Sequence, residues 1–195
     1  MGSYYNYMLT ESRKADMQDL ANEIQSMVRV IADHPRPGVM YQDMASIFQS
    51  PQGLKKVMSY FEKSLVANGI TYDRIVGLDA RGFPMAGALS ATTGKPFAMA
   101  RKKGKLPGET IFTEYELEYG TDELHLQSDS VLDNDRVLVI DDVIATGGTL
   151  EAATSLVERL NGEVVGILSI MDLTFLGGAE KLREKGYPVF SILSE

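Results

Sequence analysis

The stretch from Val137 to Leu150 reads V-L-V-I-D-D-V-I-A-T-G-G-T-L. Its first four residues form a short apolar run rich in β-branched side chains, which predicts a strand buried on both faces. Two adjacent carboxylates, Asp141 and Asp142, follow at the carboxyl end of that strand. A Gly/Thr-rich turn comes next, and apolar residues at helical spacing follow the turn.

This order of features predicts a site for a phosphate ester. The turn consists of Ala145, Thr146, Gly147, Gly148 and Thr149. Its glycines let backbone N–H groups approach an anion, its threonines add donors, and the helix dipole favours negative charge there. The carboxylates suit hydroxyl donors, such as those of a ribose that carries the phosphate. The turn is not a Walker A loop, because it lacks the required lysine; a strand that simply ends in a solvated acidic turn is the alternative.

Length and composition bound the class of protein. The 195 residues, 44% hydrophobic and 24% charged, are typical of one globular domain. A net charge of −8 argues against a nucleic-acid or anionic-membrane partner. The absence of cysteine excludes disulfide and thiolate sites and favours a cytoplasmic location. The two histidines, His34 and His125, lie far apart, which argues against a transition-metal site.

The amino-terminal part of the chain offers little chemistry. Residues 1–14 are predicted to be a disordered or arm-like tail, and residues 15–195 a single domain. Helical spacing of apolar residues predicts an amphipathic helix over 17–32 and another over 54–65. Between them, a Pro/Gly-rich break at residues 34–38 precedes a short extended segment over 39–44.

The remaining segments alternate between strands and helices. Strands are predicted over 74–78, 96–100, 137–140, 164–170 and 189–193, and helices over 85–93, from 150 and over 177–185. This alternation predicts an α/β fold with right-handed crossovers and a mostly parallel sheet. The loop from Asp79 to Pro84 follows a buried strand, at the edge where ligands of open α/β sheets bind.

A basic segment, R-K-K-G-K-L-P-G-E-T-I-F-T-E-Y-E-L-E-Y-G, runs from Arg101 to Gly120. Although the protein is acidic overall, a stretch of five residues contains four cationic side chains: Arg101, Lys102, Lys103 and Lys105. Residues 113–119 are predicted to form part of a β-ribbon. The segment is either a solvated basic hairpin or a lid over a polyphosphate.

Together these stretches resemble the adenine phosphoribosyltransferase family of type I phosphoribosyltransferases. The resemblance runs from about Met17 to the C-terminus and is carried by L-D-A-R-G-F, R-K-K-G-K-L-P-G, Y-E-L-E-Y-G and the phosphate turn. It implies a mostly parallel central sheet flanked by helices, with a flexible lid loop and a small N-terminal base-binding hood. It also implies transfer of the 5-phosphoribosyl group of phosphoribosyl diphosphate (PRPP) to N9 of adenine. Mg²⁺ is implied as cofactor, held mainly by PRPP and pyrophosphate rather than by a certain protein ligand.

The resemblance assigns the residues that contact PRPP. Residues 145–149 would cradle the 5′-phosphate, and Asp141 with Asp142 would hold the ribose hydroxyls. Asp79, Ala80 and Arg81 match the pyrophosphate loop, where we expect a non-proline cis peptide between Asp79 and Ala80 and a contact of Arg81 with the leaving group.

The lid and the quaternary structure are also implied by the resemblance. Lys105 matches a lid lysine that contacts pyrophosphate. Arg101 matches an arginine that reaches the site of a neighbouring subunit, which implies a homodimer. Glu118 matches a carboxylate near N7 of adenine that exchanges a proton there; the alternative is that it only caps a strand end.

The resemblance places the base between Tyr41 and Leu173, with the backbone of Met40 and Gln42 reading its edge. The chain departs from the commonest family pattern here, with Gln42 in place of Arg or Lys and Tyr41 in place of phenylalanine. No lysine lies within 164–180, where 6-oxopurine enzymes place one for O6. Three alternatives stay open: a 6-oxopurine substrate, a pyrimidine substrate such as orotate, and a non-catalytic PRPP-sensing regulator.

Overall fold

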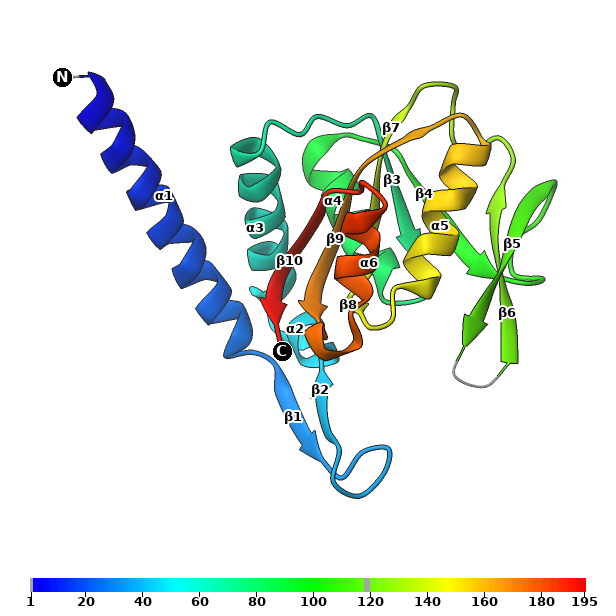
Figure 1. Ribbon diagram of the computed structural model, residues 1–195, viewed down its shortest axis with the longest axis horizontal. Coiled ribbons are helices and arrows are strands. Elements are labelled where there is room, and N and C mark those ends of the chain that lie inside the picture. The colour runs from blue at the N-terminus through cyan, green and yellow to red at the C-terminus, as the bar shows by residue number, and fades with distance from the viewer. Residues whose placement is uncertain (1, 118–119) are drawn as a thin grey trace. The chain divides into compact units, whose positions relative to one another are not determined.

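The computed structural model describes the backbone of residues 2–117 and 120–195, and the side chains of residues 13–115 and 121–195. The chain divides into two compact units, Met1–Lys63 and Ser64–Glu195. Each unit is described by itself (Figure 1).

The first unit contains helices and a two-stranded ribbon. Its elements are α1 (Gly2–Gln25), β1 (Arg29–Ala32), β2 (Met40–Asp43), α2 (Ala45–Gln49) and most of α3 (Gly53–Ala67), which crosses the boundary between the units. The ribbon pairs β1 with β2 antiparallel, and Arg29 Nη2 lies 2.5 Å from Asp43 Oδ2 across it. The extended segment and the second helix of the sequence analysis are therefore confirmed.

The first helix differs from its prediction at both ends. It continues back to Gly2, where the sequence predicts a disordered or arm-like tail, and it ends at Gln25 rather than Ala32. The predicted end is wrong because Arg29–Ala32 pairs with β2 as a strand. β-branched Val30 and Ile31 fit a strand better than a helix, although the spacing of apolar residues around them is also helical.

The second unit is built on an eight-stranded sheet. Its strands are β3 (Arg74–Leu78), β4 (Phe97–Lys102), β5 (Thr110–Leu117), β6 (Gly120–Gln127), β7 (Arg136–Ile140), β8 (Val143–Ile144), β9 (Glu163–Asp172) and β10 (Val189–Ser194). Their order is β10-β9-β7-β3-β4-β6-β5, with β8 paired to β9. The first five strands of this order run parallel, and the β5–β6 hairpin joins them antiparallel. The predicted mostly parallel sheet is confirmed.

Helices cover both faces of this sheet. They are α4 (Gly82–Thr93), α5 (Gly148–Arg159) and α6 (Gly178–Glu184), with a short 3₁₀ helix η1 (Thr174–Leu176) before α6. The chain moves one way along the sheet from β3 to β4 and the other way from β7 through β9 to β10. Right-handed crossovers therefore place α4 on one face and α5 with α6 on the other, as Figure 1 shows. In the part of the chain that the structure describes, none of the helices combines the length and apolar character that a membrane crossing needs.

The central strands β3 and β7 bring two loops together. They pair in parallel with Gly77 opposite Ile140, so the loops after Leu78 and after Ile140 start side by side. The approach is close: a Cβ atom at Gly82 would lie 2.4 Å from the carbonyl oxygen of Ile140. Glycine is thus required at the start of α4 for these loops to lie together.

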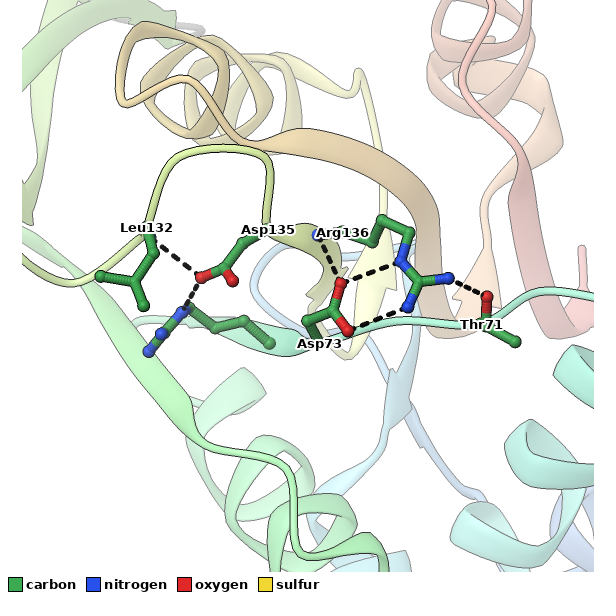
Figure 2. A network of polar contacts seen from close by, with 6 residues as sticks. Thr71, Asp73, Leu132, Asp135 and Arg136 are labelled. Carbon is green, nitrogen blue, oxygen red and sulfur yellow. Dashed lines mark hydrogen bonds and ion pairs between the residues drawn. The ribbon is translucent and has the colours of Figure 1, made fainter.

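The opposite, amino-terminal edge of the same two strands is held by ion pairs (Figure 2). Arg136 binds both carboxylate oxygens of Asp73, with Nε–Oδ2 and Nη2–Oδ1 distances of 2.9 Å, and its Nη1 donates to Thr71. Arg74 Nε lies 2.6 Å from Asp135 Oδ2. These contacts join residues more than sixty positions apart and fix the register from which both loops start.

The Asp73–Arg136 pair predicts a pH-dependent stability. Hydrogen bonds from the side chain and backbone of Arg136 lower the pKa of Asp73 from 3.8 to about 2. A carboxyl with a depressed pKa stabilises the fold above its ordinary pKa, and this contribution is lost as the pH falls toward the folded value. We expect Asp73→Asn to lower the Tm at neutral pH, by a margin that disappears between about pH 4 and pH 2.

Calorimetric scans across that pH range check this expectation. Asp129→Asn, at an exposed aspartate of the same unit, is the matched control and should leave the Tm unchanged throughout. A Tm difference for Asp73→Asn that stays constant down to pH 2 would contradict the proposed linkage.

Candidate active site

The site is built from the carboxyl ends of β3 and β7. After β7, the backbone N–H of Asp142 donates to Asp141 Oδ1 at 2.9 Å. Arg81, from the loop after β3, places Nη1 2.8 Å from Asp142 Oδ2. The parallel pairing of the strands therefore brings Arg81 close to Asp141 and Asp142, although about sixty residues separate Arg81 from these two aspartates in the sequence.

The two carboxyls share an unusual electrostatic environment. Burial raises the pKa of Asp141 well above its usual range, and the neighbouring charge of Asp142 raises it further. Burial also raises the pKa of Asp142, while the Arg81 guanidinium opposes that rise. Two negative charges are thus costly here, and a ligand that donates hydrogen bonds to these carboxylates would relieve the cost.

The Gly/Thr-rich turn leads into the amino terminus of α5, as predicted. Gly147 precedes the helix with φ +84°, a conformation that favours glycine, and Gly148 and Thr149 are its first two residues. The first N–H groups of a helix have no partner within the helix, and they carry the positive end of its dipole. The turn therefore has the backbone geometry that the sequence predicts for an anion site, and anion binding by it stays a prediction.

Gly178 packs against the backbone of this turn, a contact that the sequence analysis did not predict. A Cβ atom at Gly178 would lie 2.2 Å from the carbonyl oxygen of Ala145 and 2.6 Å from the backbone nitrogen of Gly147. The start of α6 is therefore in direct backbone contact with the turn. The sequence analysis interpreted Gly177-Gly178 only as the start of a helix, and no local signal indicates which loop a glycine touches.

The loop after β3 has the predicted cis peptide between Asp79 and Ala80. The carboxylate of Asp79 accepts a hydrogen bond from Arg101 Nε at 3.1 Å. The Arg101 guanidinium also lies 5.6 Å from the centre of the Phe83 ring. Within this chain, Arg101 is therefore held against the loop that the resemblance assigns to pyrophosphate.

The basic segment is partly neutralised by its own hairpin. Lys102 Nζ lies 2.9 Å from Asp122 Oδ2, and Lys103 Nζ lies 2.7 Å from Glu123 Oε1. Lys105 is exposed and forms no ion pair with another residue that the structure describes. Of the four cations, Lys105 is the one whose charge the described residues leave most open to a ligand.

Two predicted groups are not brought together by the described geometry. Glu118 lies outside the described residues; the flanking residues Leu117 and Gly120 pair with each other in the β5–β6 hairpin. The base-site residues belong to different units, with Met40, Tyr41 and Gln42 on β2 and Leu173 after β9.

Local contacts of the base-site residues are nevertheless defined. The Tyr41 ring makes an edge contact with His34 at a centroid distance of 5.0 Å. The Leu173 N–H donates to Ile144 just before the Gly/Thr-rich turn. A base held between Tyr41 and Leu173 stays a prediction.

Comparison with known proteins decides the family. Residues 43–194 match the family model described as phosphoribosyl transferase domain. The chain is 44% identical to adenine phosphoribosyltransferase of Prosthecochloris aestuarii over 169 residues, which are 87% of this chain and 96% of the relative. The chain belongs to the adenine phosphoribosyltransferase family.

Solved adenine phosphoribosyltransferases share its fold. The enzyme from Thermoanaerobacter pseudethanolicus aligns with a TM-score of 0.83 at 39% identity, covering 90% of this chain and 99% of the other. The Saccharomyces cerevisiae enzyme, complexed with an imino-altritol bisphosphate and adenine, aligns with a TM-score of 0.83 at 35% identity and the same coverage. The resemblance from sequence and the predicted type I phosphoribosyltransferase fold are confirmed.

The contact of Gly178 with the turn yields a prediction for this family member. We expect Gly178→Ala to force the turn away from α6, which should lower the free energy of unfolding by about 1–3 kcal/mol. The Tm should fall by roughly 2–12 °C, and the KM for PRPP should rise because the anion site is displaced.

Gly87→Ala is the matched control. Gly87 lies in α4, and a Cβ atom there meets nothing within 4 Å. Alanine should be neutral there or stabilise the helix by up to about 1 kcal/mol. Thermal melts and PRPP titrations of both variants check the prediction, and equal behaviour of the two would contradict the backbone contact at Gly178.

Proposed function

We propose that this chain transfers the 5-phosphoribosyl group of PRPP to N9 of adenine, forming AMP and pyrophosphate in purine salvage. The observation that carries the proposal is the convergence of an anion-binding turn, two carboxylates and an arginine loop at one edge of the sheet, in a member of this family. The bisphosphate and adenine bound by the yeast relative support the same pair of substrates.

The turn and the carboxylates hold the ribose phosphate. The N–H groups and hydroxyls of residues 145–149 bind the 5′-phosphate, aided by the α5 dipole. Asp141 and Asp142 accept hydrogen bonds from the 2′- and 3′-hydroxyls, which stabilises their charged forms despite burial. The same negative charge favours a ribosyl transition state with oxocarbenium character.

The leaving group is bound by the loop after β3 and by the basic segment. Backbone groups of Asp79 and Ala80 face the pyrophosphate. Arg81 is 45% exposed at its side chain, so its guanidinium can exchange Asp142 for a more highly charged anion. Lys105 adds a cation from the lid, and closure of the lid excludes water that would hydrolyse PRPP.

The residues of the candidate active site are compatible with a Mg²⁺ ion that enters the site bound to PRPP. No group of three or more metal-binding side chains occurs among the residues that the structure describes. Mg²⁺ commonly keeps several waters and binds through one or two carboxylates together with substrate phosphates. Asp141 and Asp142, which follow β7 at this edge, would supply such carboxylates. When bound, Mg²⁺ neutralises charge on the departing pyrophosphate.

The base is activated by a residue of the hairpin and recognised by residues of β2 and of the segment after β9. Glu118 exchanges a proton with N7 as N9 becomes a nucleophile. Tyr41 and Leu173 sandwich the ring. Backbone groups of Met40 and Gln42 match the 6-amino donor and the N1 acceptor of adenine, so the departures at Tyr41 and Gln42 are tolerated.

A homodimer and a cytoplasmic location complete the proposal. In the dimer, Arg101 would reach the site of the neighbouring copy and would have to give up its bond to its own Asp79. No nucleic acid or membrane takes part in the proposed reaction, whose substrates are small molecules.

Product analysis with four bases tests the proposal. We expect AMP to form from adenine, PRPP and Mg²⁺, with little product from hypoxanthine, guanine or xanthine. The physical reason is that a donor–acceptor pair set for adenine leaves an unmatched polar group with a 6-oxopurine. Product from an oxopurine would overturn the base-site assignment, and PRPP binding without any product would favour the sensor.

A second test concerns Glu118. We expect Glu118→Gln to lower kcat by roughly 10²–10⁴ because the amide cannot exchange a proton with N7. Glu114→Gln, at an exposed glutamate of the same hairpin, is the matched control and should keep normal turnover. Steady-state rates with saturating adenine and PRPP measure the effect, and near-normal turnover of Glu118→Gln would remove it from the mechanism.

A further inference from the structure

The loop between β1 and β2 holds an aromatic ring that the proposed mechanism does not use. The ring is the imidazole of His34, and it contacts Tyr41, the second residue of β2. The two ring centroids lie 5.0 Å apart and the ring planes meet at 74°, an edge-to-face contact. Aromatic rings prefer this arrangement because the positive edge of one ring meets the negative face of the other. The contact is therefore attractive as well as close.

Hydrogen bonds within the loop hold the backbone that carries the imidazole. The N–H of His34 donates to the carbonyl oxygen of Val39 at 3.2 Å. The N–H of Gly38 donates to Asp33 Oδ1 at 2.6 Å. On either side of the loop, β1 and β2 pair in antiparallel register. The His34 and Tyr41 rings are thus attached to one hydrogen-bonded segment of the first unit.

The edge-to-face contact leaves a face of the Tyr41 ring for a base. If the imidazole edge meets the Tyr41 ring, His34 covers one face of that ring and leaves the opposite face. If instead the Tyr41 edge meets the imidazole, His34 covers neither face. A stacked base needs only one face of the ring. His34 can therefore hold the plane of the Tyr41 ring without competing with a base.

We propose that His34 is a positioning residue for adenine, which holds the Tyr41 ring in the plane on which the base stacks. Tyr41 lies on a strand of only four residues and is half-buried. Fixing the rotation of such a side chain when a ligand binds costs conformational entropy. The contact with His34 fixes the ring in advance, which strengthens binding of the base. This inference rests on the proposed function, because it requires Tyr41 to stack on adenine.

Two substitutions of His34 test the proposal. We expect His34→Ala to raise the KM for adenine roughly 2- to 10-fold, as for loss of one aromatic pair. His34→Phe keeps an aromatic ring at this position and should keep the KM for adenine near its original value. The KM for PRPP should stay unchanged in both variants, because the ring pair acts on the base alone. Arg36→Ala, at an exposed residue of the same loop, is the matched control and should leave both KM values unchanged.

A double-mutant cycle with Tyr41→Leu distinguishes positioning of the ring from a general effect on the loop. We expect Tyr41→Leu to raise the KM for adenine, and His34→Ala to add nothing further in that background. The proposal alone would be overturned by an equal effect of His34→Ala in both backgrounds, by no effect in either, or by an equal loss in His34→Phe. An unchanged KM for adenine in Tyr41→Leu would overturn the base-site assignment, and the proposal with it.

Discussion

The parallel pairing of β3 with β7 is the constraint on which the candidate active site depends. It places the loop with Arg81 beside the loop with Asp142, and their side chains meet at 2.8 Å. The pairing is tight enough that Gly82 admits no side chain against the carbonyl of Ile140. At the far edge, Arg136 with Asp73 and Arg74 with Asp135 hold the same two strands in register. A shift of one residue between these strands would separate the groups that the site needs.

An acidic chain that binds a polyanion must place its positive potential locally. The net charge is −8, and two carboxyls stand at the centre of the site. Burial raises the pKa of both, because negative charge is costly in this environment. The compensating positive potential comes from backbone N–H groups and the α5 dipole, which cannot be lost by titration. Lys102 and Lys103 pair with acids of the same hairpin, and Arg101 pairs with Asp79. Lys105 is the cation of the segment that forms no ion pair with another described residue.

The strength of the sequence signal decided what could be predicted. The buried runs at β3, β7 and β9 and the turn before α5 are short-range patterns, so the strands, the parallel sheet and the position of the turn followed from the residues. The end of α1 was missed, because apolar spacing fits a helix up to Ala32, while pairing with β2 makes Arg29–Ala32 a strand. Gly178 was also missed as a support of the turn. Contacts between distant segments depend on the tertiary structure, and no periodicity encodes them.

The Gly/Thr-rich turn is supported by the start of α6. A Cβ atom at Gly178 would lie 2.2 Å from the carbonyl oxygen of Ala145 in that turn. A turn built of glycine and threonine would lose much conformational entropy if it became ordered only when a ligand bound. Contacts within the folded protein order the turn before the ligand binds, so binding does not have to offset this loss of entropy. Hydrogen-bond donors that are already in position also interact more strongly with an anion. The small residues that let N–H groups approach a phosphate therefore require a rigid neighbour, and α6 supplies one.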